Sequence, residues 1–539
     1  MVRRRGRELE LLPRAIQALV QRHADSPAAL WGWIERLQDA RELQGTVAVP
    51  RQGVVATPAR VARLMAERLL RGPHGNRPLR LLDAGCGSGR LLTAALREAS
   101  RRRLRLGCEG VETDVAAARW AQALEEVHRA AGAALVGWKI LHADFLLDYA
   151  PPSHFDLCIA NPPWVAARAL SAGYRRKLHS HLRGMGRADL SALFVQRLLE
   201  VLRPGGRLCV IVPNKLLASD YATALRHRLL QDFRLEEVWD LAGDGVFSAH
   251  AAYPVILVVA HRRPAAGDTV AVHHGGGAVR TRWPQEALLA LPRHVVPLDL
   301  PADSWPLLRR LLAGPRLGDA VPVGCGLAVP GFQRAMDRGR DRIICSGDIR
   351  PFRVRGRRRF APQQLDLGRR TLARQKVPKV VIPGMFRRLH AAFDARGDLL
   401  GRVYFVPVSG RADSRRALLL ALLNSRLYAV LYRGLFGGVA QSGGYLRLNA
   451  PYLRRLPWPQ RAPSAALLRL VQEIERSGAP ESGRARLDRG VEDLFGLAAP
   501  ERRLVARLER RLHPGPSGSP RTARRLSRLS GSAPEVAPS

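Results

Sequence analysis

The feature that most constrains the fold is an alternation of short apolar runs with amphipathic segments between residues 79 and 260. Six runs have the composition of buried strands: LRLLDAG, LGCEGVETD, KILHAD, FDLCIANPP, GRLCVIVPN and AAYPVILVVAH. Between them RLLTAALREAS, AAARWAQALEEVHRAAG and DLSALFVQRLLEVLRPGG have helical periodicity. Strands that alternate with helices form a mostly parallel sheet covered on both faces. The sequence therefore predicts an α/β fold with a doubly wound sheet.

The rest of the 539 residues divides around this region. Residues 1–50 are expected to be an N-terminal helical segment, with an apolar set at helical spacing: Leu9, Leu12, Ile16, Leu19 and Val20. The sheet domain is expected over 51–265, and a Gly- and Pro-containing linker over 266–300. A second, mixed α/β domain is expected over 301–500. Residues 501–539 are predicted to be a basic, partly disordered tail.

The first predicted strand ends at Asp83 and runs into a glycine-rich turn. Gly85, Gly87 and Gly89 permit a tight turn and let a ligand approach the backbone. The spacing D-x-G-x-G-x-G departs from the dinucleotide fingerprint G-x-G-x-x-G. It resembles the first motif of methyltransferases that use S-adenosylmethionine (SAM), which implies a Rossmann-like methyltransferase sheet with SAM as cofactor.

Acidic residues follow the next two predicted strands. Glu112 ends the second strand, where an acid can bind both hydroxyls of a ribose. Asp144 follows the third and is a candidate acceptor for the adenine amino group of the cofactor, with Phe145 against the adenine ring. Each acid alone is most simply a solvated strand-end residue. Three strand ends in succession favour a single ligand site, because the carboxyl ends of parallel strands lie together.

The fourth strand stops at Asn161-Pro162-Pro163-Trp164. Proline lacks the backbone donor that a sheet requires, so these residues form a stiff corner that is either structural or chemical. The order of glycine loop, acid, Asp-Phe and NPPW resembles the amino-methyltransferases. The resemblance implies that Asn161 Oδ1 and the Pro162 carbonyl accept both protons of a target amino group, that Asn161 also borders the cofactor, and that Trp164 stacks on the base.

Two flanking segments resemble the TaqI-like gamma group of type II DNA adenine-N6 methyltransferases. Thr57 and Pro58 match a Thr-Pro motif that lies near the SAM carboxylate in that group. Residues 189–230 match its middle portion. Phe247 matches a second base-stacking aromatic, which with Trp164 would sandwich a flipped base, although a buried core phenylalanine is an equal alternative.

Five stretches between residues 317 and 459 resemble the target-recognition region of the same enzymes, so the resemblance covers about 50–495. Double-stranded DNA is the implied partner, and a separate restriction endonuclease or defence protein is a further one. Arginines in this region are expected to contact phosphates or guanine. The 50 residues before the Thr-Pro motif are too few for a nuclease domain, and cleavage by this chain is not expected.

The composition supports a polyanionic partner. The net charge is +41, and only five of the 87 basic residues are lysine. The last 39 residues hold nine arginines and three glutamates, so +35 of the charge belongs to residues 1–500. The six cysteines show no metal-ligand spacing, so no metal site is expected. Without a secretory signal or an apolar run of about 18 residues, a cytoplasmic protein free of the membrane is expected.

The motifs leave several functions open. The first motif is DAGCGSG rather than the DPACGSG more common in the gamma group, and the corner ends in Trp rather than Tyr. Methylation of cytosine N4 is therefore an alternative to adenine N6. Methylation of RNA or of a protein glutamine is a second alternative, and a catalytically silent DNA-binding defence subunit is a third.

Overall fold

The computed structural model describes residues 18, 20–22, 26–48, 56–151, 154–181, 188–242, 253–275, 277–329, 332–365, 367–410, 413–437, 440–441, 445–477 and 480–513. The chain divides into two compact units. The first comprises residues 1–305 with 438–442, and the second comprises 306–437 with 443–539. Each unit contains apolar clusters of its own.

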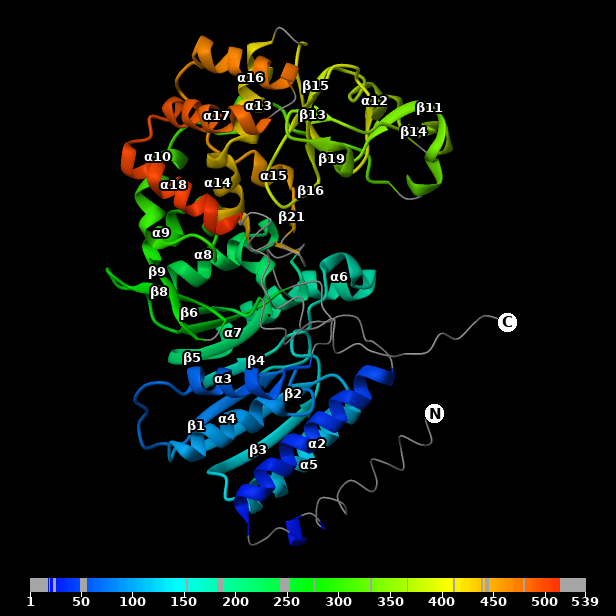
Figure 1. The fold of residues 1–539 in the computed structure, drawn as a ribbon. Coiled ribbons are helices and arrows are strands. Elements are labelled where there is room, and N and C mark those ends of the chain that lie inside the picture. The colour runs from blue at the N-terminus through cyan, green and yellow to red at the C-terminus, as the bar shows by residue number, and fades with distance from the viewer. Residues whose placement is uncertain are drawn as a thin grey trace, which may run out of the picture. The chain divides into compact units, whose positions relative to one another are not determined.

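The first unit is built on a nine-stranded sheet with the order β3-β2-β1-β4-β5-β7-β6-β8-β9 (Figure 1). Its strands are β1 (Leu79–Ala84), β2 (Leu106–Glu112), β3 (Leu135–His142), β4 (Phe155–Ala160), β5 (Leu202–Pro213), β6 (Arg234–Asp240), β7 (Pro254–Ala260), β8 (Thr269–His274) and β9 (Val279–Pro284). Strands β1 to β5 are parallel, and β7 runs antiparallel between β5 and β6. The predicted α/β sheet is confirmed. Because β7 lies between β5 and β6, the strand order differs from the order 3-2-1-4-5-6 of the dinucleotide-binding fold.

Within its described residues the first unit also contains eight helices, most of which contact the strands directly. They are α2 (Pro27–Ala48), α3 (Ala59–Leu69), α4 (Arg90–Arg101), α5 (Val115–Ala130), α6 (Ala172–His181), α7 (Leu190–Val201), α8 (Thr223–Gln231) and α9 (Gln285–Ala290). Leu81, Cys108 and Ile159 from the strands join α2, α3, α4 and α5 in one cluster. Figure 1 shows α2, α4 and α5 together on one side of the sheet. Helix α7 packs against β5 outside this cluster.

The order of the sheet reverses between β1 and β4. β1 pairs with β2 on one side and with β4 on the other, and Asp83 lies opposite Ile159. In open α/β sheets ligands bind outside the carboxyl ends of the strands at such a reversal. The glycine loop after β1 and the corner after β4 therefore meet at the position where a ligand is expected.

Two predictions about element boundaries are wrong. Residues 266–300 are not a linker, because they contain β8, β9 and α9, which extend the sheet and its covering. The helix predicted over 189–206 ends at Val201, because Leu202 already belongs to β5. In the predicted tail, residues 501–512 belong to a helix, and residues 514–539 lie outside the described part of the chain.

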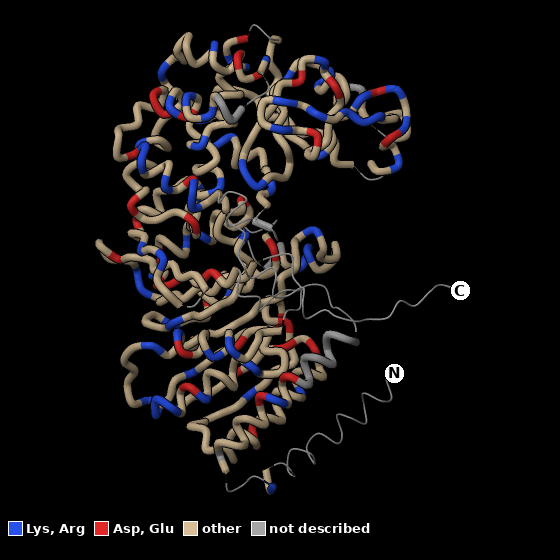
Figure 2. The backbone as a smooth tube through the Cα atoms, viewed as in Figure 1, with Lys and Arg blue, Asp and Glu red and all other residues tan. Residues whose placement is uncertain are grey.

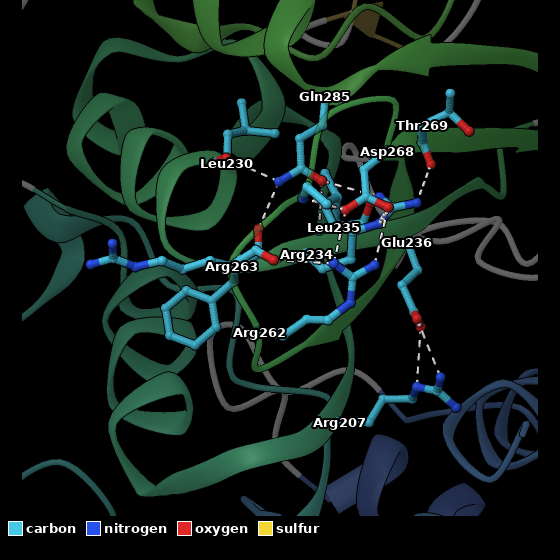
Figure 3. A network of polar contacts seen from close by, with 12 residues as sticks. Arg207, Leu230, Arg234, Leu235, Glu236, Arg262, Arg263, Asp268, Thr269 and Gln285 are labelled. Carbon is cyan, nitrogen blue, oxygen red and sulfur yellow. Dashed lines mark hydrogen bonds and ion pairs between the residues drawn. The ribbon is translucent and has the colours of Figure 1, made fainter. Parts of the chain in front are cut away.

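A buried polar network fastens this extension to the sheet (Figure 3). Arg234 of β6 donates to Gln285 Oε1 at 3.1 Å and pairs with Asp268 at 3.0 Å. Gln285 in turn donates to the carbonyl oxygens of Leu230 at 2.9 Å and Phe233 at 2.6 Å. The network thereby satisfies backbone groups that the packing of α8 and α9 would otherwise bury unpaired.

The second unit combines short strands with helices. Its strands are β10 (Gly324–Cys325), β11 (Met336–Ile344), β12 (Ile349–Arg350), β13 (Arg353–Val354), β14 (Arg358–Phe360), β15 (Lys379–Pro383), β16 (Met385–Phe386), β17 (Ala392–Asp394), β18 (Leu399–Leu400), β19 (Val403–Pro407) and β21 (Tyr445–Arg447). Its helices are α10 (Trp305–Leu312), α11 (Leu317–Ala320), α12 (Arg369–Ala373), α13 (Ser414–Asn424), α14 (Arg426–Phe436), α15 (Ala450–Leu453), α16 (Ala465–Ser477), α17 (Pro480–Leu494) and α18 (Ala499–Leu512).

Helices α13 and α14 form the centre of this unit. Leu419, Leu422 and Tyr428 are fully buried, and α14 packs against α18. Over the described residues no single helix has the length and hydropathy to cross a bilayer. Helices α13 and α14 meet that criterion only as a pair bent by 58°.

Candidate active site

The glycine loop between β1 and α4 adopts the backbone that its sequence predicts. Gly85, Gly87 and Gly89 have φ values of +76°, +53° and +79°. Side chains with a Cβ rarely adopt this left-handed region, so glycine relieves strain at each position. The amides of Gly85 and Cys86 both donate to the carbonyl oxygen of Val111, at 2.8 and 3.1 Å. The loop is therefore held against the end of β2.

Glu112 completes this connection. Its carboxylate accepts from the backbone amide of Gly87 at 2.9 Å and from that of Asp114 at 2.8 Å. The acid predicted to bind the cofactor ribose thus lies at the end of β2 in contact with the glycine loop. It defines one wall of the candidate site.

Asp83 lies at the base of the loop and is completely buried. Neither of its carboxylate oxygens has a hydrogen-bond partner among the described residues. Burial, and secondarily the charge of Glu112, holds the pKa of Asp83 well above its usual range. An unpaired buried carboxylate favours a cationic ligand, because the attraction offsets the lost hydration. The ammonium and sulfonium groups of SAM fit this requirement.

Asp144 begins the turn after β3. Its Oδ1 accepts from the amides of Leu146 at 2.8 Å and Leu147 at 3.3 Å. Its Oδ2 accepts from the hydroxyl of Tyr174 in α6 at 2.8 Å. The neighbouring Phe145 is buried, and its ring centroid lies 5.2 Å from that of Phe194. In this structure Phe145 is thus packed in the core.

The corner after β4 follows the strand that pairs with β1, the strand that leads into the glycine loop. Asn161 Nδ2 donates to Thr57 Oγ1 at 3.0 Å, and Thr57 is itself buried. Pro162 is buried, whereas Trp164 is partly buried and packs against the apolar cluster under α2 to α5. The structure therefore brings together Thr57 and Asn161, which the sequence gives as two separate candidate site residues. Phe247 lies outside the described residues.

Several residues that support the site were not predicted. Asp189, at the start of α7, accepts from the amide of Ala167 at 3.1 Å and pairs with Lys215 at 2.6 Å. This pairing ties the loop after the corner to the end of β5. Tyr174 was also missed, because nothing in a local pattern indicates its partner 30 residues away. The role of Asp189 as the residue that precedes helix α7 could have been predicted, since Asp is common at that position.

Helix α2 contributes a further unpredicted contact. Gln38 is buried and donates to the carbonyl oxygen of Ser88 at 3.3 Å and to Thr93 Oγ1 at 3.0 Å. It thus fixes the glycine loop from the side of the N-terminal helix. Within the described ranges, no group of three or more His, Cys, Asp or Glu side chains is arranged to hold a metal ion.

Comparisons with known proteins agree with this geometry. Residues 104–247 match the family described as Eco57I restriction-modification methylase. The chain is 26% identical over 446 residues to the type II methyltransferase M.PaeR7I of Pseudomonas aeruginosa, covering 69% of this chain and 75% of that protein. It is 29% identical over 145 residues to a tRNA1(Val) (adenine(37)-N6)-methyltransferase of Musicola paradisiaca, covering 26% of this chain and 52% of that protein.

Among solved structures, a nuclease-deletion mutant of the Type ISP restriction-modification enzyme LlaGI, in complex with a DNA substrate mimic, has a similar fold. The TM-score is 0.50 at 11% identity, over 78% of this chain and 54% of that one. Fold, motif order and sequence relatives agree with one another. Residues 104–247 and the longer sequence matches thus relate this chain to methyltransferases of type II restriction–modification systems.

Proposed function

We propose that this enzyme methylates adenine N6 in double-stranded DNA at a specific sequence, with the target base flipped out of the duplex. The observation that carries the proposal is the hydrogen bond from Asn161 Nδ2 to Thr57 Oγ1. Because Thr57 takes the donor end of the amide, the oxygen end has a fixed orientation at the corner. An oriented acceptor at this place suits an exocyclic amino group.

The chemistry required of the corner is positioning. The lone pair of an aromatic amine is delocalised into the ring, which makes the nitrogen a poor nucleophile. Asn161 Oδ1 and the Pro162 carbonyl would each accept one amino proton and hold the nitrogen closer to tetrahedral geometry. The same two oxygens stabilise the positive charge that develops on the nitrogen during transfer. Trp164 would stack on the base and offset part of the cost of unstacking it.

The remaining site residues would hold the cofactor. When bound, SAM supplies an activated methyl group on a sulfonium. Asp83 would face the cationic part of that molecule, Glu112 its ribose hydroxyls, and Asp144 its adenine amino group. Thr57 would lie near its carboxylate and would orient Asn161 as well.

Adenine is favoured over cytosine by two observations. Thr57 and Pro58 match the Thr-Pro motif of the TaqI-like adenine enzymes. In addition, the tRNA1(Val) methyltransferase that is similar to 145 residues of this chain is named as an adenine-N6 enzyme. That relative acts on tRNA, so RNA is the second candidate substrate. The match to M.PaeR7I covers 69% of the chain and so extends well beyond the catalytic region, which supports DNA and a target-recognition role for the second unit.

The test is a transfer assay with SAM tritiated in its methyl group. The protein is incubated with unmethylated bacterial DNA, with total tRNA and with DNA made resistant by prior treatment with the enzyme and unlabelled SAM. Label in N6-methyl-2′-deoxyadenosine from DNA, absent from the pretreated sample, is the expected result. Label in N4-methylcytosine or in tRNA alone would overturn the adenine or the DNA assignment respectively, and the absence of label with intact SAM binding would favour a silent subunit.

A further inference from the structure

The second unit contains an arginine-rich ribbon formed by β11 and β14, which pair antiparallel. Residues 334–359 hold ten arginines and only three aspartates. The pairing is irregular, because both Met336 and Asp341 lie opposite Phe360. The four residues between them, 337–340, therefore bulge out of the ribbon. Bulges of this kind re-aim side chains and are frequent beside functional sites.

The bulge has a tightly specified backbone. Gly339 has a φ of +75°, and a Cβ there would lie 2.5 Å from the carbonyl oxygen of Phe360, which no side chain could tolerate. Asp337 has a φ of +60°, a left-handed conformation that is costly for a residue other than glycine. Strain of this kind persists where the surrounding structure enforces it. The surrounding structure therefore enforces the conformation of the bulge, in which Arg338 and Arg340 lie on either side of Gly339.

One side of the ribbon is fixed by an apolar core. Met336, Ile343 and Phe360 are buried together with Phe332 and Leu399. The opposite side consequently faces solvent and carries Arg342 and Arg359, while Arg338 and Arg340 in the bulge and Arg358 at the start of β14 are exposed as well. Figure 2 shows the basic residues concentrated along β11 and β14.

These arginines are not neutralised by the protein. Arg342 lies directly opposite Arg359 in the ladder, and like charges in such a pair destabilise a sheet. Within the part of the chain that the structure describes, none of the five forms an ion pair with an acid, and Asp341 pairs instead with Lys376. A surface that keeps five unneutralised charges at a cost in stability is explained by a polyanionic ligand.

We infer that this bulged ribbon is a docking surface for double-stranded DNA, an inference that rests on the proposed function. A two-stranded ribbon fits the major groove of a duplex, and guanidinium groups bind phosphates and guanine bidentately. The ribbon supplies binding energy to the second unit without belonging to the catalytic machinery.

The test uses the full-length protein and fluorescein-labelled DNA duplexes carrying its methylation site, in anisotropy titrations at several NaCl concentrations. The variants are Arg342→Gln/Arg359→Gln and Arg338→Gln/Arg340→Gln. Arg469→Gln is the matched control, because Arg469 is an exposed arginine of α16 in the same unit. Each ribbon double variant is expected to bind DNA at least 10-fold more weakly. The slope of log affinity against log salt should fall by about 0.9 for each phosphate that the variant no longer neutralises.

Thermal unfolding separates this role from a structural one. Because Arg342 and Arg359 repel each other, their replacement should leave the melting temperature unchanged or raised while DNA binding falls. Ribbon variants that bind DNA like the wild type and the Arg469→Gln control would overturn the inference while the proposed function stands. Equal weakening of binding to an RNA duplex of the same length would overturn the commitment to DNA. A wild type that neither binds nor methylates DNA would instead contradict the proposed function itself.

Discussion

Asn161 Nδ2 donates a 3.0 Å hydrogen bond to Thr57 Oγ1, which joins two residues 104 positions apart. Thr57 precedes helix α3 and Asn161 follows strand β4, so the bond forms only when the sheet is complete. It fixes one end of the amide that we propose binds the target amino group. The orientation of this amide by a buried hydroxyl is thus a feature of the fold.

Replacing Thr57 by valine should lower the rate of methyl transfer about 10-fold. Valine keeps the shape of the side chain but removes the acceptor, and removing a hydrogen bond of this kind costs about 1–1.5 kcal/mol. Single-turnover transfer of tritiated methyl groups to DNA measures the rate. Thr57→Ser keeps the hydroxyl and should retain most of the activity. Equally slow transfer in both variants would show that the hydroxyl does not act through Asn161.

Replacing Asp83 by asparagine should weaken SAM binding about 10- to 100-fold, because the bound cation no longer faces a buried carboxylate. Since the pKa of Asp83 is raised in the protein alone, binding of a cation should release a proton. Affinity should therefore fall as the pH falls through that raised pKa. Calorimetry of the wild type in two buffers of different ionisation enthalpy counts the proton, and Asp83→Asn should abolish its release.

The same substitution should stabilise the cofactor-free protein. A carboxyl whose pKa is raised by folding destabilises the folded state above its unfolded pKa of about 4. Asp83→Asn removes this penalty, and the free energy of unfolding at pH 7 should rise by about 1–3 kcal/mol. Urea unfolding without SAM checks this. A variant that is less stable and binds SAM normally would mean that Asp83 is a structural residue.

Asp268 should stabilise the extension of the sheet in a pH-dependent way. Its hydrogen bond to Arg262 lowers its pKa to about 2. A lowered carboxyl pKa contributes stability that is present above about pH 4 and disappears as the pH falls through about 2. Asp268→Asn should therefore cost about 1 kcal/mol at pH 7 and little at pH 2. The exposed Asp232→Asn is the control, and a cost of Asp268→Asn that does not change with pH would contradict this account.

Lys379 and Asp394 form a fully buried ion pair in the second unit, at 3.0 Å. Lys379→Met should cost about 3 kcal/mol, because it leaves the buried carboxylate with only the more distant Arg357, at 4.0 Å, as counterion. Asp394 also accepts from the amide of Arg396 at Oδ1 and from that of Asp398 at Oδ2, and an asparagine keeps one of these two acceptors without the charge. The double variant Lys379→Met/Asp394→Asn should thus recover part of the stability in a urea titration. If the double variant were no more stable than Lys379→Met, the loss of stability would come from packing and not from the buried charge.

Much of the catalytic unit could be predicted from the sequence because its central strands are buried on both faces. The runs ending at Asp83, Glu112 and Asn161 are mostly apolar, and β1, β2 and β4 lie where those runs predict. Strand β6 was missed, since RLEEVWD carries charges that obscure its burial. Glu237 there is buried against Arg71, which lies 166 residues away. Such pairings leave no local pattern.

The same limit explains the residues missed at the site. Strands β8 and β9 are short and flanked by glycines, so their local sequence resembles a linker. Only the pairing of β8 with β6, and of β9 with β8, completes them. The contacts of Tyr174 with Asp144 and of Gln38 with Ser88 depend on how α6 and α2 pack. Periodicity predicts that a helix exists but does not give the side chain that it places beside a ligand.

The most direct test of the central claim is the variant Asn161→Ala, compared with the exposed Asn76→Ala as control. Single-turnover methylation of DNA and calorimetric SAM binding are measured on the same preparations. The proposed mechanism predicts a rate at least 100-fold lower for Asn161→Ala, with a SAM dissociation constant within a few-fold of the wild type. A variant that retains wild-type methylation of adenine N6 would contradict the role of Asn161 in binding the target amino group.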